Sequence, residues 1–201
     1  MNRMQDIFSD ALAGEIPVEG NTFADEYAEN LSGRTLECAS CTFERCTFSD
    51  FDVERYYFVD CTFKGCDLSG LRLASSLLSR TQFIDCRMSG LTLNDGILRD
   101  VFFTNCLMDY AALSASKFTH VSLTGCALRH GILGDLKTTD WALKSCDLSE
   151  SEIVRTPLKG LDLSGCDLNG LLIDPTDLRG ATVSAMQALS FARLMGLIIK
   201  D

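Results

Sequence analysis

Ten cysteines in a chain of 201 residues are the side chains best suited to chemistry in this sequence. Thiolates hold zinc where two to four of them converge on one point, and they form disulfides in oxidising compartments. Only Cys38 and Cys41 have the C-x-x-C spacing of such a site, and no second pair or histidine cluster accompanies them. Free thiols also serve as small apolar core residues. The sequence favours this last role, so we expect no metal site and no cofactor.

The cysteines recur at a fixed spacing along the chain. Seven of them form one series in which each follows the last by four pentapeptides, Cys46, Cys66, Cys86, Cys106, Cys126, Cys146 and Cys166. Every fifth position from Phe43 to Val183 is apolar at 28 of 29 sites, with Thr138 as the exception. Helical or alternating strand spacing does not produce a period of five. The pattern indicates a coil with four short sides, in which like residues stack at a strand spacing of about 4.8 Å.

Carboxylates could act as general acids or bases, and Asp50, Asp52 and Glu54 are close enough in sequence to meet at one corner of the coil. A coil with short sides has no long loops to build the concave pocket that small-molecule chemistry needs. The chain has only two histidines and no glycine-rich phosphate loop. We therefore expect a protein that is not an enzyme and that works through its surface.

Three pentapeptides show the repeat most fully, Cys66-Asp67-Leu68-Ser69-Gly70, Cys146-Asp147-Leu148-Ser149-Glu150 and Cys166-Asp167-Leu168-Asn169-Gly170. On these residues the chain resembles the pentapeptide-repeat family over residues 41–183. The resemblance implies an all-β solenoid, a right-handed quadrilateral parallel β-helix of about seven coils. Eight glycines occupy the last place of a pentapeptide, where the chain turns a corner and a positive φ is expected.

Residues 1–40 are expected to form an acidic cap and an irregular first coil. Leu31 and Leu36 are one pentapeptide apart, but they are two residues out of phase with Phe43. This offset indicates an insertion near residues 38–40. From Cys41 onward the register is unbroken as far as Val183.

A helix is expected at each end of the coil. The first is expected around residues 4–12. At the other end, in residues 184–201, Ser184 and Gln187 have the spacing of a capping box, and Gly196 suits the end of a helix. Met186 and Leu189 share the face of this C-terminal capping helix that would close the last coil.

The apolar tail after this helix, Leu197, Ile198 and Ile199, has two interpretations. In several pentapeptide-repeat proteins the carboxyl end forms a twofold dimer contact, and the resemblance implies that this tail, with Met186 and Leu189, would suit the same use. The alternative is that the tail only plugs the core. The sequence leaves both open.

The chain has 28 acidic and 18 basic residues, a net charge of -10. This balance argues against wrapping nucleic acid and favours protein partners. Residues 1–37 hold eight of the acids and two of the bases. Several pentapeptide-repeat proteins mimic a DNA duplex, bind DNA gyrase or topoisomerase IV, and protect them from quinolones or toxins. The resemblance implies that function here, although the unbroken register leaves no room for the extruded loops of the quinolone-resistance members.

The acids of the coil gather on two adjacent sides, the side of the cysteine series and the next one. We expect a partner surface there, and the candidate residues are Asp50, Asp52, Glu54, Asp67, Asp147, Glu150, Glu152 and Asp167. A duplex mimic would need a more continuous field, because every phosphate of DNA carries a charge.

A second candidate surface is an apolar row. Tyr57, Leu77 and Ile97 are also spaced by four pentapeptides, at a place that points outward and is usually polar, and Lys117 and Lys137 continue the series. Exposed apolar rows often mark a protein interface. The alternative is that the amino-terminal cap folds back over the row.

The chain has no apolar stretch long enough to span a membrane, and Asp6 and Asp10 are out of place in a secretory signal. We expect a cytoplasmic, non-enzymatic protein-interaction module of the topoisomerase-binding type. The alternative is a regulatory or structural scaffold with an unrelated protein partner.

Overall fold

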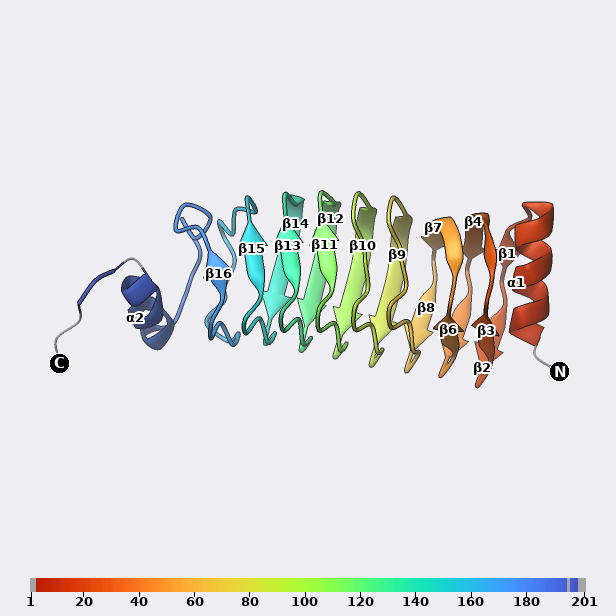
Figure 1. Cartoon of the computed structure of the whole chain (residues 1–201), viewed down its shortest axis with the longest axis horizontal. Coiled ribbons are helices and arrows are strands. Elements are labelled where there is room, and N and C mark those ends of the chain that lie inside the picture. Colours follow the sequence, from red (N-terminus) through yellow and green to blue (C-terminus); the bar gives the residue numbers. More distant parts are fainter. Residues whose placement is uncertain (1–2, 195, 199–201) are drawn as a thin grey trace.

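The computed structural model describes residues 3–194 and 196–198, and Figure 1 shows an elongated rod of stacked coils with one helix at each end. Helix α1 is Arg3–Gly14 and helix α2 is Ala185–Leu194. The strands between them are β1 (Val18–Glu19), β2 (Thr22–Ala24), β3 (Tyr27–Glu29), β4 (Ser32–Ala39), β5 (Thr42–Glu44), β6 (Thr47–Ser49), β7 (Asp52–Val59), β8 (Thr62–Lys64), β9 (Leu77–Ile84), β10 (Ile97–Thr104), β11 (Ala112–Ser114), β12 (Lys117–Thr124), β13 (Ile132–Gly134), β14 (Lys137–Lys144), β15 (Glu152–Val154) and β16 (Leu172–Ile173). No helix among the described residues is long and apolar enough to cross a membrane.

Every strand pairs in parallel with a segment one coil away, which is four pentapeptides along the chain. Phe43 lies opposite Phe63, and Ile97 lies opposite Lys117. The eight-residue strands, such as β9 and β10, run across two neighbouring sides, whereas the other two sides are held by short strands and isolated bridges. The expected four-sided parallel β-solenoid, with a helix at its carboxyl end, is therefore confirmed.

The coil begins earlier than the sequence analysis predicted. Val18 pairs with Cys38 and Phe23 pairs with Phe43, so residues 18–40 share the register of the later coils. The inferred insertion near residues 38–40 is wrong. Leu31 and Leu36 occupy the inward first place of their pentapeptides, which cysteine takes at Cys41 and Cys46, and this made the frame look shifted. The solenoid accordingly has about eight turns instead of seven.

A ladder of stacked phenyl rings fills one side of the core. Neighbouring centroids of Phe23, Phe43, Phe63, Phe83 and Phe103 are 5.4, 4.6, 4.8 and 5.0 Å apart, with interplanar angles of 14°, 12°, 10° and 7°. All five rings are buried. Identical rings at the coil spacing pack without voids, so each ring loses contact with water on both faces.

Thr138 marks a local exchange of large and small residues. Leu136 and Trp141, which occupy places usually held by small residues, are both buried, and the Trp141 ring packs edge-on against Phe118 with centroids 6.3 Å apart. Thr138 itself is only half-buried. The volume that Thr138 lacks is supplied by these two residues.

The ten cysteines are free and buried. The thiols of nine of them donate to backbone carbonyls; for example, Cys66 Sγ lies 3.3 Å from the carbonyl oxygen of Phe43, and Cys146 Sγ lies 3.3 Å from that of Leu123. The neighbouring Cys66 thiol and burial raise the pKa of Cys46. The cysteines are therefore small core residues, as expected, with their weak donors satisfied by the coil below.

The corners of the coil turn through a left-handed residue in the last place of the pentapeptide. Seven of the eight glycines predicted for this role have positive φ, and Gly165 does not. Most corners, however, use another residue, such as Asp60 with a φ of 55° or Asn105 with a φ of 53°. Aspartate and asparagine tolerate this conformation best among non-glycine residues. The same chemistry that turns the corner therefore places a row of carboxylates along the outer edge of the rod.

Replacing Tyr56 by phenylalanine should raise the free energy of unfolding by about 1 kcal/mol, because an unpaired buried polar group costs about 1–3 kcal/mol. Tyr56 is buried against Phe58, and its hydroxyl has no hydrogen-bond partner among the described residues. Burial also raises the pKa of Tyr56. Urea unfolding measures the difference, with the exposed Tyr110→Phe as the control. A loss of stability in Tyr56→Phe would contradict the prediction and point to a buried water at the hydroxyl.

Candidate interaction surfaces

Helix α1 closes the amino-terminal end of the rod. Its apolar face, Met4, Phe8 and Ala11, is buried, and the Phe8 ring lies 5.8 Å from that of Phe23. Gln5 forms hydrogen bonds with the exposed backbone edge of β3. Its side-chain Nε2 donates to the carbonyl oxygen of Glu29 at 3.1 Å, and its Oε1 accepts from the backbone amide of Glu29 at 2.8 Å. The expected helix is confirmed. It covers the apolar core of the first coil and forms hydrogen bonds with its backbone.

The outward apolar row, which we call the stripe, consists of Tyr57, Leu77 and Ile97 on strands β7, β9 and β10. Ile97 is 46% exposed, and the other two are half-buried. Helix α1 packs against β1, β3 and β4 at the end of the rod, away from the stripe (Figure 1). The alternative in which the amino-terminal cap covers the stripe is therefore wrong for the described residues.

The candidate acids form two groups that lie far apart along the rod. Asp50, Asp52 and Glu54 are exposed at the corner where β7 begins. The second group, Asp147, Glu150, Glu152 and Asp167, lies on coils nearer the carboxyl end. Between them the column that contains Asp67 runs from Thr47 through Asp67, Arg87, Leu107 and Ala127 to Asp147. The structure brings together the members of each group, but it does not join the two groups into one acidic strip.

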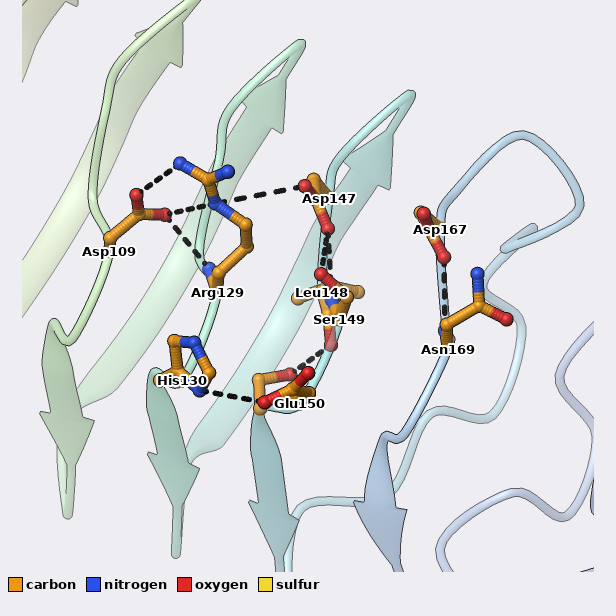
Figure 2. A network of polar contacts seen from close by, with 10 residues as sticks. Asp109, Arg129, His130, Asp147, Leu148, Ser149, Glu150, Asp167 and Asn169 are labelled. Carbon is orange, nitrogen blue, oxygen red and sulfur yellow. Dashed lines mark hydrogen bonds and ion pairs between the residues drawn. The ribbon is translucent and has the colours of Figure 1, made fainter.

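Two acids of the second group, Asp147 and Glu150, contact basic side chains within the rod. In Figure 2, Arg129 lies between two aspartates, with its guanidinium 2.5 Å from Asp109 and 3.9 Å from Asp147. His130 Nδ1 lies 3.3 Å from a carboxylate oxygen of Glu150. These contacts join neighbouring coils, and they reduce the negative potential that these two acids present to solvent.

The same device recurs at the corners. Four aspartates each pair with a base one coil further along, in the pairs Asp25 with Arg45, Asp60 with Arg80, Asp100 with His120 and Asp135 with Arg155. The hydrogen bond from Arg80 lowers the pKa of Asp60 below its ordinary value. The sequence analysis did not predict these pairs. Opposite charges separated by four pentapeptides, in the last place of the pentapeptide, are the signal that would have found them.

The carboxyl-terminal helix begins with the predicted capping box, but it contacts the last coil through residues other than those predicted. The capping box is present, because the backbone amide of Gln187 donates to Ser184 Oγ at 3.2 Å and that of Ser184 donates to Gln187 Oε1 at 2.7 Å. The Gln187 side chain also donates to the carbonyls of Leu163 and Cys166, both at 2.9 Å. A glutamine amide thus covers an open backbone edge at each end of the rod.

Met186 and Leu189 do not close the core as predicted. Met186 is 74% exposed and Leu189 is 40% exposed, because Gln187 and Phe191 take the face that meets the coil. Leu197 and Ile198 are exposed as well, and Ile199 lies outside the described residues. The plugging role is therefore wrong for the described part of the tail, and the dimer role stays a prediction.

The described residues include no group of three or more histidine, cysteine, aspartate or glutamate side chains arranged to hold a metal ion. An apolar cavity of about 300 Å³ lies between α2 and the last coil and is lined by Ile173, Leu178, Val183 and Phe191 among others. Leu107 and Tyr110 are further exposed apolar residues, on the side of the cysteine series, that the sequence analysis did not predict.

Residues 76–153 match the family model described as a pentapeptide repeat region. The chain carries a pentapeptide-repeat region. The matched segment of this pentapeptide-repeat coil extends from β9 into β15, and the register described above continues it in both directions. No curated protein sequence matches the chain.

Solved structures of pentapeptide-repeat proteins are similar to this coil. Trypsin-treated QnrB1, a plasmid-mediated fluoroquinolone resistance protein, is 20% identical, with a TM-score of 0.44 over 92% of this chain and 97% of that chain. HetL, a pentapeptide repeat protein involved in heterocyst differentiation regulation in the cyanobacterium Nostoc sp. strain PCC 7120, is 18% identical, with a TM-score of 0.42 over 84% of this chain and 87% of that chain. The fold of the present chain follows from its own strand register.

Replacing Asp109 by asparagine should destabilise the pentapeptide-repeat coil at neutral pH and not in acid. The hydrogen bond from Arg129 lowers the pKa of Asp109, so the ion pair stabilises the fold above the ordinary aspartate value of about 3.9 and is lost as the pH falls through the folded-state pKa. Arg129 is half-exposed, and solvent screening keeps the expected loss at pH 7 to about 0.5–1 kcal/mol. Urea unfolding at pH 7 and in acid measures it. A difference that does not change with pH would contradict the prediction.

Proposed function

We propose that this chain is a non-enzymatic protein-interaction module that works through the outer surface of its rod. The observation that carries the proposal is the uncovered stripe on β7, β9 and β10. An outward-facing apolar row, here with Ile97 exposed and Tyr57 and Leu77 half-buried, often marks a protein interface. The stacked core makes the rod stiff, so the outward residues keep a fixed spacing that a partner can recognise.

The finer proposal is that the partner is DNA gyrase or topoisomerase IV, which the chain would bind as a DNA mimic and protect from quinolones or toxins. The net charge of -10, the exposed Asp50, Asp52 and Glu54, and the family resemblance of the repeat support it. The competing proposal is a regulatory or structural scaffold for an unrelated protein. The gap between the two acidic groups and the contacts of Asp147 and Glu150 with Arg129 and His130 favour the scaffold, because duplex mimicry needs a continuous negative field.

A supercoiling assay separates the two proposals. Purified gyrase is titrated with the full chain, with and without a quinolone, beside a variant in which Asp50, Asp52 and Glu54 are changed to asparagine or glutamine. The topoisomerase proposal predicts inhibition of gyrase or rescue from the quinolone, and it predicts that the variant loses most of this effect. If excess protein neither inhibits nor rescues the enzyme, the topoisomerase proposal fails and the scaffold remains.

Two further features belong to the proposal. The exposed Met186, Leu189, Leu197 and Ile198 at one end of the rod support a homodimer through the carboxyl terminus. Light scattering across a concentration series tests it, and a monomer at all concentrations contradicts it.

The ten free and buried thiols suit the reducing cytoplasm, where they would stay unpaired.

A further inference from the structure

The stripe continues without a break into two lysines. The register places Lys117 directly above Ile97 and Lys137 directly above Lys117. Over five coils the column therefore runs from Tyr57 through two aliphatic residues to two cations, with one residue from each coil, and Glu37 lies one coil before Tyr57. At the strand spacing of about 4.8 Å, it extends for roughly 19 Å along the axis of the rod.

The two lysines differ from the arginines at the corners of this rod. Arg45, Arg80 and Arg155 each pair with an aspartate one coil earlier, whereas neither Lys117 nor Lys137 forms an ion pair with any described residue. Like charges directly opposite each other on neighbouring strands are unfavourable. The fold thus leaves two adjacent cations uncompensated, at one end of an apolar row that nothing in the described structure covers.

One neighbouring residue adds to the positive charge of the column. Arg99 is exposed on β10 two residues beyond Ile97, so it faces outward on the same side. At the next corner the carboxylate of Asp100 is held by His120, with a distance of 2.7 Å to Nδ1. An acidic group from outside would therefore meet unpaired cations here. In this corner column Asp100 is engaged by His120, whereas Asp140, three residues after Lys137, is exposed.

We propose that this column binds an amphipathic α-helix of a partner protein, which lies along the rod with apolar residues on the stripe and acidic residues on Lys117 and Lys137. This proposal deepens the interaction function proposed above and rests on it. The pitch of an α-helix, about 5.4 Å, is close to the coil spacing, so one turn of the partner meets one coil. The apolar anchors then fall at positions i, i+4 and i+7, and the acidic residues fall at i+11 and i+14.

The test uses a defined peptide as the probe. A fluorescein-labelled 18-residue peptide carries leucine at positions 3, 7 and 10, glutamate at positions 14 and 17, and alanine or glutamine elsewhere, and a second peptide has lysine in place of the two glutamates. Fluorescence anisotropy against the full chain should show binding of the glutamate peptide that weakens with salt, and binding of the lysine peptide that is about tenfold weaker or more.

Charge exchange supplies the decisive result. The double variant Lys117→Glu with Lys137→Glu should bind the glutamate peptide about tenfold more weakly and should bind the lysine peptide more tightly. The control is Lys144→Glu, because Lys144 is an exposed lysine in another column of β14, and this change should alter the affinity for neither peptide. Leu77→Asp should weaken both peptides by about tenfold. Because Leu77 is half-buried, its thermal unfolding is measured as well, and a midpoint close to that of the unchanged chain is expected.

Three outcomes overturn the inference: no binding of either peptide at millimolar concentration, equal effects of Lys144→Glu and the double variant, or self-association of the chain that the stripe variants abolish. The last would assign the column to a second copy of this chain. None of these outcomes touches the supercoiling assay, which depends on the acidic corner, so failure of the stripe is distinguishable from failure of the interaction function.

Discussion

Phe83→Ala should lower the free energy of unfolding by about 3–5 kcal/mol, a large share of the stability of a single domain. Phe83 lies at the centre of the ring ladder, with ring centroids 4.8 Å from Phe63 and 5.0 Å from Phe103, and it is fully buried. Alanine would leave a cavity bounded by two coils that cannot move together, because their backbone ladders fix the spacing. Urea unfolding followed by circular dichroism measures the loss.

Phe102→Ala provides the matched control, since it makes the same chemical change one residue before the ladder position. The Phe102 ring is on the outside of β10, half-exposed, and meets the edge of His120 at 5.3 Å. Its loss should cost well under half as much. Equal losses for the two variants would mean that the ring ladder is not the centre of the core.

Phe8→Ala should both destabilise the chain, by about 3 kcal/mol or more, and make it associate. The Phe8 ring contacts Phe23, Phe43, Phe48 and Phe51, so its removal weakens the whole seal between α1 and the first coil. Once the helix detaches, the unpaired edges of β1, β2 and β3 become open to other chains. Thermal unfolding and light scattering follow the two effects.

Ser9→Ala is the control for the cap, because Ser9 is exposed on the same helix. It should leave both the unfolding midpoint and the molecular mass in solution unchanged. If the Phe8→Ala protein is less stable but keeps the molecular mass in solution of the unchanged chain, the coil edge is protected by something other than α1.

Much of the fold could be predicted because the constraint is local and repeats. An inward residue every fifth position and a small residue two places earlier are enough to define a four-sided coil, and the cysteine series sets its period. The error at the amino end has the same origin. Leu31 and Leu36 are large residues in the first place of their pentapeptides, the place that cysteine takes at Cys41 and Cys46. The apolar pattern therefore pointed to the wrong phase, and only the pairing of Val18 with Cys38 resolved it.

The candidate surfaces were harder to predict, because recognition depends on which outward residues are satisfied by their neighbours. Glu150 and Asp147 are acids by sequence, but contacts with His130 and Arg129 on the next coil reduce what they offer to a partner. Met186 and Leu189 share a helix face by spacing, but the orientation of α2 is decided by Gln187 and its bonds to two carbonyls of the last coils.

The sequence by itself determined the period, the parallel stacking and the burial of the cysteines, since these follow from which residue types recur in every pentapeptide and in every fourth one. The tertiary structure decided which charges are free. Stacking places residues from neighbouring coils within reach of each other, and it leaves Lys117 above Ile97 with no acid beside it, while most corner bases meet an aspartate. Charge compensation depends on distances between coils, and those distances exist only once the chain has folded.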